Sequence, residues 1–141
     1  MISEGESKEM IKKGWIRCWV MIEVMAVGKE VTKEALKKHL DKIKREKGIK
    51  IYKKNLEKAE KIGKKIEKKD IYTQIVEMEF VIENLRKLSD FVMVYGPSAL
   101  EILEPEKIQI DMNEAQEMLN RIATLLHSFT TARMQNALIP K

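Results

Sequence analysis

The sequence is poor in the residues that build most catalytic and metal sites, with one cysteine and two histidines among 141 residues. Cys18 has no second cysteine with which to form a disulfide or a thiolate metal cluster, which favours a reduced, cytoplasmic location. His39 and His127 are far apart and show no HxxxH or HxH spacing, whereas a triad or metal centre needs convergent His, Cys, Asp or Glu side chains. We therefore expect a protein that is not an enzyme and holds no metal or cofactor.

Long hydrophobic runs are also absent. The longest, residues 15–27, is interrupted by Arg17 and Glu23, and it is shorter than the roughly 20 residues that a helix needs to cross a bilayer. Residues 1–14 are polar and charged, so we predict no signal peptide and expect a flexible N-terminal tail there. The sequence favours a protein without a membrane partner.

Aromatic residues are scarce at 6%, while charged residues reach 35%, above the roughly 25% of an ordinary globular chain. Lys and Glu supply most of this charge, a balance typical of thermophilic proteins. The charge is unevenly placed, because residues 29–69 hold 17 Lys and Arg against seven Asp and Glu, a net +10, while the remainder carries −5. We call residues 29–69 the basic block.

The basic block could attract RNA or DNA at low salt. However, it contains 16 Lys and the single arginine Arg45, and its only aromatic residue is Tyr52, whereas surfaces that read nucleic acid favour arginine forks and stacking aromatics. A solvated, thermophilic Lys face is the simpler interpretation, and nucleic-acid binding is the alternative. Its candidate residues are Lys37, Lys38, Lys42, Lys44, Arg45, Lys53, Lys54, Lys64 and Lys65.

The periodicity predicts a mixed α+β domain over residues 15–111. Residues 15–27 alternate as a strand, whose core-facing side chains are Ile16, Cys18, Val20, Ile22, Val24 and Ala26. Next come a helix from about Thr32 to Gly48, a strand at 49–54, a strand at 71–82, a helix at 84–95 closed by Gly96 and Pro97, and a short strand from Leu100 to Pro105 that Ile108 and Ile110 could extend. Residues 55–69 fit either a charged helix or an irregular segment. This β-α-β-β-α-β order predicts a ferredoxin-like antiparallel sheet.

Residues 112–141 add a long amphipathic C-terminal helix and tail. Asn113 is the expected N-cap, with Gln116 returning the bond. Apolar residues then repeat at three- and four-residue steps, at Ala115, Met118, Ile122, Leu125, Phe129 and Ala132. We expect this helix to pack on the domain or on a partner subunit.

One strand face is predicted to be unusually apolar. In a ferredoxin-like fold the helices cover one face of the sheet, so the other would present Trp15, Trp19, Met21 and Met25, too apolar a set to stay wet. The C-terminal helix of the same chain, a second subunit, or a ligand or RNA base could cover it. Together with Met118, Ile122, Leu125 and Phe129, this set is the candidate interface of a homo-oligomer.

Residues 91–108 carry a recognisable pattern, in which Tyr95-Gly96-Pro97 precedes Leu100-Glu101-Ile102-Leu103-Glu104-Pro105. This segment resembles the C-terminal extension of WYL-domain transcription regulators, where a helix, a glycine turn and a similar strand close a ferredoxin-like unit. The resemblance implies the fold and no functional side chain. More broadly, the chain resembles archaeal protein families, which implies no activity.

Three function classes remain open at this point. The favoured one is an oligomeric interaction or regulatory module, and the alternative is a nucleic-acid-binding accessory protein. An enzyme using Glu77, Glu79 or His127 as acid–base groups has least support, and a cation site at Glu77, Glu79 and Glu83 lacks supporting ligands. We expect His39 on the surface and His127 at a helix interface.

Overall fold

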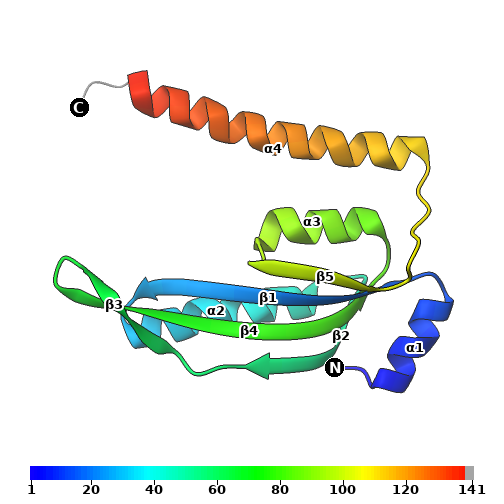
Figure 1. Cartoon of the computed structure of the whole chain (residues 1–141), viewed down its shortest axis with the longest axis horizontal. Coiled ribbons are helices and arrows are strands. Elements are labelled where there is room, and N and C mark those ends of the chain that lie inside the picture. The colour runs from blue at the N-terminus through cyan, green and yellow to red at the C-terminus, as the bar shows by residue number, and fades with distance from the viewer. Residues whose placement is uncertain (139–141) are drawn as a thin grey trace. The chain divides into compact units, whose positions relative to one another are not determined.

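The computed structural model describes residues 1–138 and confirms a mixed α+β architecture with an antiparallel sheet and a long C-terminal helix (Figure 1). The elements are α1 (Glu4–Lys12), β1 (Ile16–Val27), α2 (Lys29–Arg45), β2 (Ile49–Leu56), β3 (Glu60–Ile66), β4 (Lys69–Ile82), α3 (Leu85–Tyr95), β5 (Ala99–Glu104) and α4 (Met112–Leu138). The strand order is β2-β4-β1-β5, and β3 also pairs with β4. The chain divides into two compact units, Met1–Ile108 and Gln109–Lys141.

The core lies between the sheet and the helices α2 and α3. Cys18 pairs with Phe80 and Val20 with Met78, and all four side chains are buried on the same face of the central strands β1 and β4. Leu36 and Leu40 of α2 and Phe91 of α3 complete the same cluster. The alternation in residues 15–27 therefore predicted the buried side correctly. We call this side of the sheet the Phe80 face.

The N-terminal segment is not the flexible tail that its polarity suggested, because residues Glu4–Lys12 form helix α1. Ser3 caps this helix by accepting a hydrogen bond from the Glu6 backbone N–H at 3.1 Å. The helix packs against β2 and β4, and Ser7 is fully buried. The Ser3-x-x-Glu6 spacing is a capping-box signal and could have revealed the helix.

Residues 55–69 form no helix and are irregular only at 57–59, since β2 continues to Leu56 and β3 forms a hairpin with β4. Leu56 and Ile66 have helical spacing, yet both are at least half-exposed on strands. Glu67 and Lys68 form the tight turn with φ values of 50° and 66°, as paired left-handed residues do in two-residue hairpins. The hairpin extends beyond the rest of the sheet (Figure 1).

Strand β2 contains a bulge that reverses the direction of its later side chains. Ile51 pairs with Phe80, but the next paired residue, Lys53, lies opposite Glu79. Tyr52 and Lys53 therefore share one side of the sheet, and Lys54 returns to the helix side opposite Met78.

Two helix boundaries test the predicted caps. Gly96 ends α3 in the left-handed conformation, with φ of 52°, which confirms the predicted turn. The N-terminal bond of α4 is made by Asp111, whose Oδ1 accepts from the Glu114 backbone N–H at 2.8 Å, so the predicted Asn113 cap is wrong. Residues 105–111 form no strand, although Ile108 packs against the core. Within residues 1–138, no helix is both long and apolar enough to span a membrane.

Candidate functional site

The face of the sheet opposite the Phe80 face carries the predicted Trp and Met set. Trp19, Met21 and Met25 alternate along β1, the first two half-buried and Met25 57% exposed. Trp15 is half-buried just before the strand. We call this side the Trp19 face. It is not the continuous apolar surface that the sequence suggested, because Trp19 pairs with Glu79 and Met21 with Glu77.

A polar network holds one end of the Trp19 face. The Arg17 guanidinium lies 4.8 Å from the centre of the Tyr52 ring, and the Tyr52 hydroxyl donates to Glu79 Oε1 at 3.0 Å. Lys53 Nζ also lies 3.4 Å from a Glu79 oxygen. Burial, with the Glu79 hydrogen bond adding to it, raises the pKa of Tyr52. The network stabilises the sheet and leaves Glu79 engaged rather than poised as an acid or base.

The side chains considered for catalysis lie on two elements: Glu77 and Glu79 of β4 line one cavity of about 210 Å³, and His127 is on α4. Among the described residues, no three His, Cys, Asp or Glu side chains come close enough together to hold a metal ion. Cys18 is fully buried, and desolvation raises the pKa of its thiol to about 12, so it is unreactive. His39 is half-buried rather than on the surface, with Nε2 3.2 Å from the Tyr95 carbonyl oxygen. His127 Nε2 lies 3.5 Å from Thr131 Oγ1.

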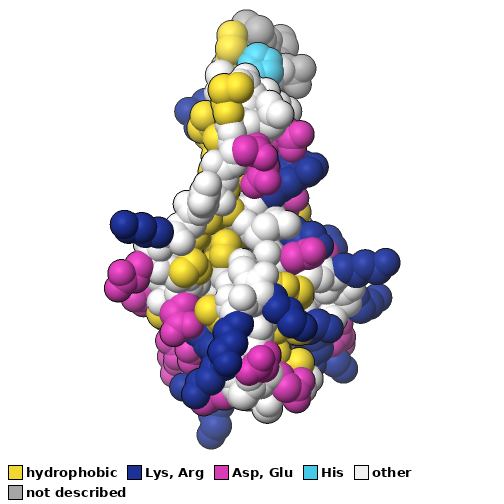
Figure 2. Space-filling model, turned by 90° about the vertical axis from the view of Figure 1, so that its right-hand side faces the viewer, with side chains coloured by type: hydrophobic (Ala, Val, Ile, Leu, Met, Phe, Trp, Pro, Cys, Tyr) yellow, Lys and Arg dark blue, Asp and Glu magenta, His cyan; other side chains and the backbone are white. Residues whose placement is uncertain are grey.

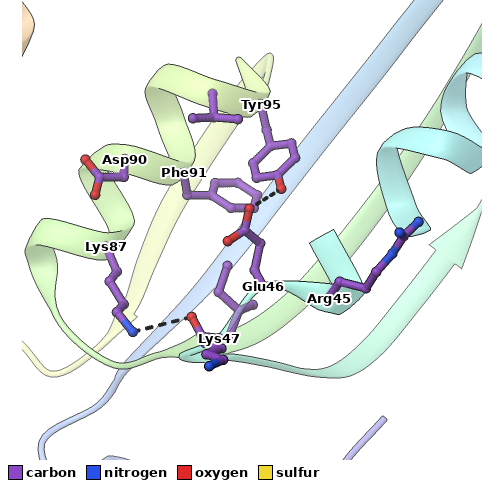
Figure 3. A pocket seen from close by; sticks show the side chains of 9 residues that line it. Arg45, Glu46, Lys47, Lys87, Asp90, Phe91 and Tyr95 are labelled. Carbon is purple, nitrogen blue, oxygen red and sulfur yellow. Dashed lines mark hydrogen bonds between the residues drawn. The ribbon is translucent and has the colours of Figure 1, made fainter. Parts of the chain in front are cut away.

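A cleft of about 450 Å³ opens where the C-terminal end of α2 meets α3 (Figure 3). Its floor contains Phe91 and Tyr95, and the Tyr95 hydroxyl donates to Glu46 Oε1 at 2.6 Å. Burial, and then this carboxylate, raise the pKa of Tyr95 strongly. Lys87 Nζ donates to the Lys47 carbonyl oxygen at 3.4 Å and to Glu83 at 2.6 Å. The bonds to Glu46 and Lys47 tie α3 to the short connection between α2 and β2.

A second cleft, of about 430 Å³, lies between α2 and β2, and we call it the α2–β2 cleft. It collects Lys37, Lys44 and Lys54 from the basic block, over a floor that includes Leu36 and Leu40. The sequence did not indicate this meeting, because Lys54 reaches the helix side only through the β2 bulge. The full lining is Glu30, Lys33, Glu34, Leu36, Lys37, Leu40, Asp41, Lys44, Lys54, Leu56 and Gln74.

The other candidate nucleic-acid residues of the basic block do not line this cleft. Lys42 Nζ lies 5.8 Å from the Tyr95 ring centre, and Arg45 lines the cleft beside α3. Lys53 is on the Trp19 face, and Lys65 contacts Asp70 at 3.7 Å on the hairpin that also carries Lys64. Lys38 is exposed on α2. On the face in Figure 2, basic and acidic side chains are interspersed rather than gathered in one basic patch.

Helix α4 carries the predicted interface residues Met118, Ile122, Leu125 and Phe129 at heptad spacing over a single 27-residue helix. Met112, Leu119 and Leu126 recur every seven residues beside them. The stripe is therefore three positions wide in each heptad.

A protein-family model matches residues 17–140. The chain belongs to the MJ0538 family. The match runs from β1 into α4, so the sheet and the C-terminal helix both belong to the sequence that defines the MJ0538 family. It agrees with the expected archaeal-type family and gives no support to the WYL resemblance. No curated protein and no solved structure matches the chain.

Proposed function

We propose that this member of the MJ0538 family is a non-enzymatic, self-associating interaction module, in which α4 of one chain pairs with α4 of a second copy. The observation that carries the proposal is the heptad stripe of α4. The stripe belongs to the compact unit Gln109–Lys141, whose described residues, up to 138, form one helix. A single helix cannot bury an apolar stripe within itself, and an isolated helix in water is only marginally stable.

The pattern of side chains along α4 favours an antiparallel pair. In an antiparallel pair, a- and d-type positions of the two copies face each other as Ala115 against Ala132, Met118 against Phe129, and Ile122 against Leu125. Each of these three contacts occurs twice, because the two copies are related by two-fold symmetry. In this register alanine faces alanine at the two ends of the pair, and large side chains face large side chains in the middle. The two residues of each layer are therefore of similar size.

Charge supports the same direction. Asp111 and Glu114 lie at the start of α4, while Arg133 lies near its end. Antiparallel pairing brings Glu114 level with Arg133 of the other copy, whereas parallel pairing places like charges side by side. Antiparallel helix dipoles also attract each other.

The sheet supports a ferredoxin-like assignment as part of the proposal. The order β2-β4-β1-β5 has every neighbouring pair antiparallel. With β3 treated as an inserted hairpin, this is the order expected of a split βαβ unit. The buried single cysteine further supports a reducing, cytoplasmic setting.

Light scattering tests the association. The wild-type chain of 16.5 kDa should show the mass of a dimer, and the double variant I122K/L125K should be a monomer. The fluorescence of Trp15 and Trp19, which both belong to the sheet unit, should stay unchanged in that variant. N120K/T124K adds the same charge on the side of α4 away from the stripe and should remain dimeric. A monomeric wild type, or equal loss in both variants, would refute self-association through α4.

Cysteine cross-linking tests the direction separately. Under mild oxidation, A115C mixed with A132C should form a disulfide heterodimer, while A132C alone should not cross-link. Self-linking of A132C would show a parallel pair and overturn the antiparallel register without overturning the dimer. Cys18 does not interfere, because it is fully buried.

A further inference from the structure

The α2–β2 cleft brings two ammonium groups together, and the one carboxylate that acts on Lys54, that of Asp41, offsets only part of their effect. Lys44 comes from the last turn of α2, and Lys54 comes from β2 just after the bulge. Both line the cleft, and within the described part of the chain neither forms an ion pair with a carboxylate. Burial, followed by the nearby Lys44 charge, lowers the pKa of Lys54. Two like charges held together in this way are unfavourable until an anion neutralises them.

We propose that the α2–β2 cleft binds a phosphomonoester dianion that carries an apolar group. The two charges of a phosphomonoester match the two ammonium groups of Lys44 and Lys54, and lysine is a common phosphate ligand. Lys37 lies two turns before Lys44 on α2 and lines the same cleft, so it supplies a third cation within reach of the ligand.

The acidic residues of the cleft leave this end positive. Glu30 is engaged by Lys33 at 4.0 Å. The Asp41 carboxylate raises the pKa of Lys54, but by less than burial and the Lys44 charge together lower it. Glu34 lies about three turns from Lys44 along the helix. The most positive part of the cleft is therefore the Lys44–Lys54 end.

The floor of the cleft indicates which kind of chemical group the bound phosphate carries. Leu36 and Leu40 are buried beneath it, and Leu56, which is 50% exposed, lies at its side. The Gln74 side-chain amide is already used, since it donates to the Glu57 carbonyl oxygen at 2.8 Å. The floor therefore offers apolar contact to an aromatic or aliphatic group. A free phosphorylated metabolite and the 5′-phosphate end of a nucleic acid share this chemistry.

Calorimetric titration with phenyl phosphate tests the site. Wild-type protein should bind at physiological ionic strength, and K44Q/K54Q should bind at least tenfold more weakly. The control K38Q/K47Q removes the same net charge from exposed positions outside this cleft and should bind as wild type. Equal weakening in both variants, or no binding to wild type, would overturn the proposal. NMR of the lysine side chains provides a second readout, because bound phenyl phosphate should raise the pKa of Lys54.

A matched pair of single-stranded RNAs distinguishes the two sources of phosphate. If a 5′-phosphorylated oligomer binds tenfold tighter than its 5′-hydroxyl counterpart, and K44Q/K54Q abolishes this preference, the ligand is a nucleic-acid end. Binding of phenyl phosphate without any such preference identifies a small phosphorylated molecule. A third outcome would overturn the site: both RNAs bind equally, K38Q/K47Q weakens that binding as much as K44Q/K54Q does, and phenyl phosphate does not bind. This outcome would show a general attraction of the protein for polyanions. None of these outcomes depends on dimerisation through α4.

Discussion

The two faces of the same strands have different physical roles. On the Phe80 face, Val20, Val76 and Phe80 are completely buried beneath the helices. On the Trp19 face, the same strands place Trp19 and Met21 beside carboxylates, and both side chains remain half-buried. Close packing therefore concentrates stability on one face, while the other depends on charge pairs that water weakens.

One end of the Trp19 face departs from this pattern. Val81 points to the same side as Arg17, its cross-strand partner, yet it is fully buried. Helix α1 packs against β4 and β2, and its buried Ser7 is small enough to allow close approach. The Trp19 face is therefore closed by α1 around Val81 and is partly exposed to water along the rest of β1.

The largest expected difference between the faces comes from truncating a methionine on each. Met78→Ala should lower the free energy of unfolding by about 2–5 kcal/mol, because it leaves a cavity in a closed core. Met21→Ala should cost about 1 kcal/mol or less, since that side chain is already partly hydrated. Urea denaturation of the two variants measures both values. Equal losses would show that the Trp19 face is packed as tightly as the core.

Each face also has a tyrosine hydroxyl bound to a glutamate, which gives a smaller and pH-dependent contrast. Tyr95→Phe removes the 2.6 Å bond to Glu46 and should cost about 1–2 kcal/mol at neutral pH. Tyr52→Phe removes the 3.0 Å bond to Glu79 and should cost about 1 kcal/mol.

The pH dependence of the tyrosines has a definite sign. Folding raises the pKa of both tyrosines, so the stabilisation is complete below the unfolded value of about 10 and is lost as the pH rises above it. Unfolding curves between pH 8 and about 11 should therefore slope downward, and Tyr95→Phe should flatten them more than Tyr52→Phe. A wild-type protein that gains stability over this range would contradict the assigned direction.

The smallest effect is expected at the Lys53–Glu79 pair. Lys53 is 65% exposed, and its ammonium lies 3.4 Å from the carboxylate. Lys53→Gln should change the free energy of unfolding by no more than about 0.5 kcal/mol, because water screens the charge. Thermal unfolding at low and high salt measures the effect. A loss above about 1 kcal/mol at both salt concentrations would place this pair among the strong contacts of the molecule.

The sequence predicted the elements whose side chains have a clear period. The strands around Val20 and Val76 and the helix ending at Gly96 were recognisable, because their apolar side chains share one environment along the whole element. The β3 hairpin was missed because Leu56 and Ile66 are exposed strand residues whose spacing imitates a helix. Helix α1 was missed because its polar, charged composition is typical of a terminal tail, and only the Ser3-x-x-Glu6 capping signal indicates a helix there.

The candidate sites were less predictable than the fold. The stripe of α4 follows from local periodicity, so its residues could be named from the sequence. The meeting of Lys44 and Lys54 could not, because it depends on an extra residue in β2 that no periodic pattern announces. Asp41 and the apolar floor likewise reach the cleft only through the packing of α2 beside that strand.

The bulge in β2 also separates the two surfaces of the sheet in their tolerance of a length change. Deleting one residue at Tyr52 or Lys53 would remove the bulge and restore simple alternation with β4, yet Lys54 would still lie opposite Met78 and Leu56 opposite Val76. The α2–β2 cleft would therefore keep its β2 side chains, while the Trp19 face would lose either the Tyr52 hydroxyl or the Lys53 ammonium beside Glu79. A deletion of one residue at this point of the chain would thus alter one surface of the sheet and leave the other as it is.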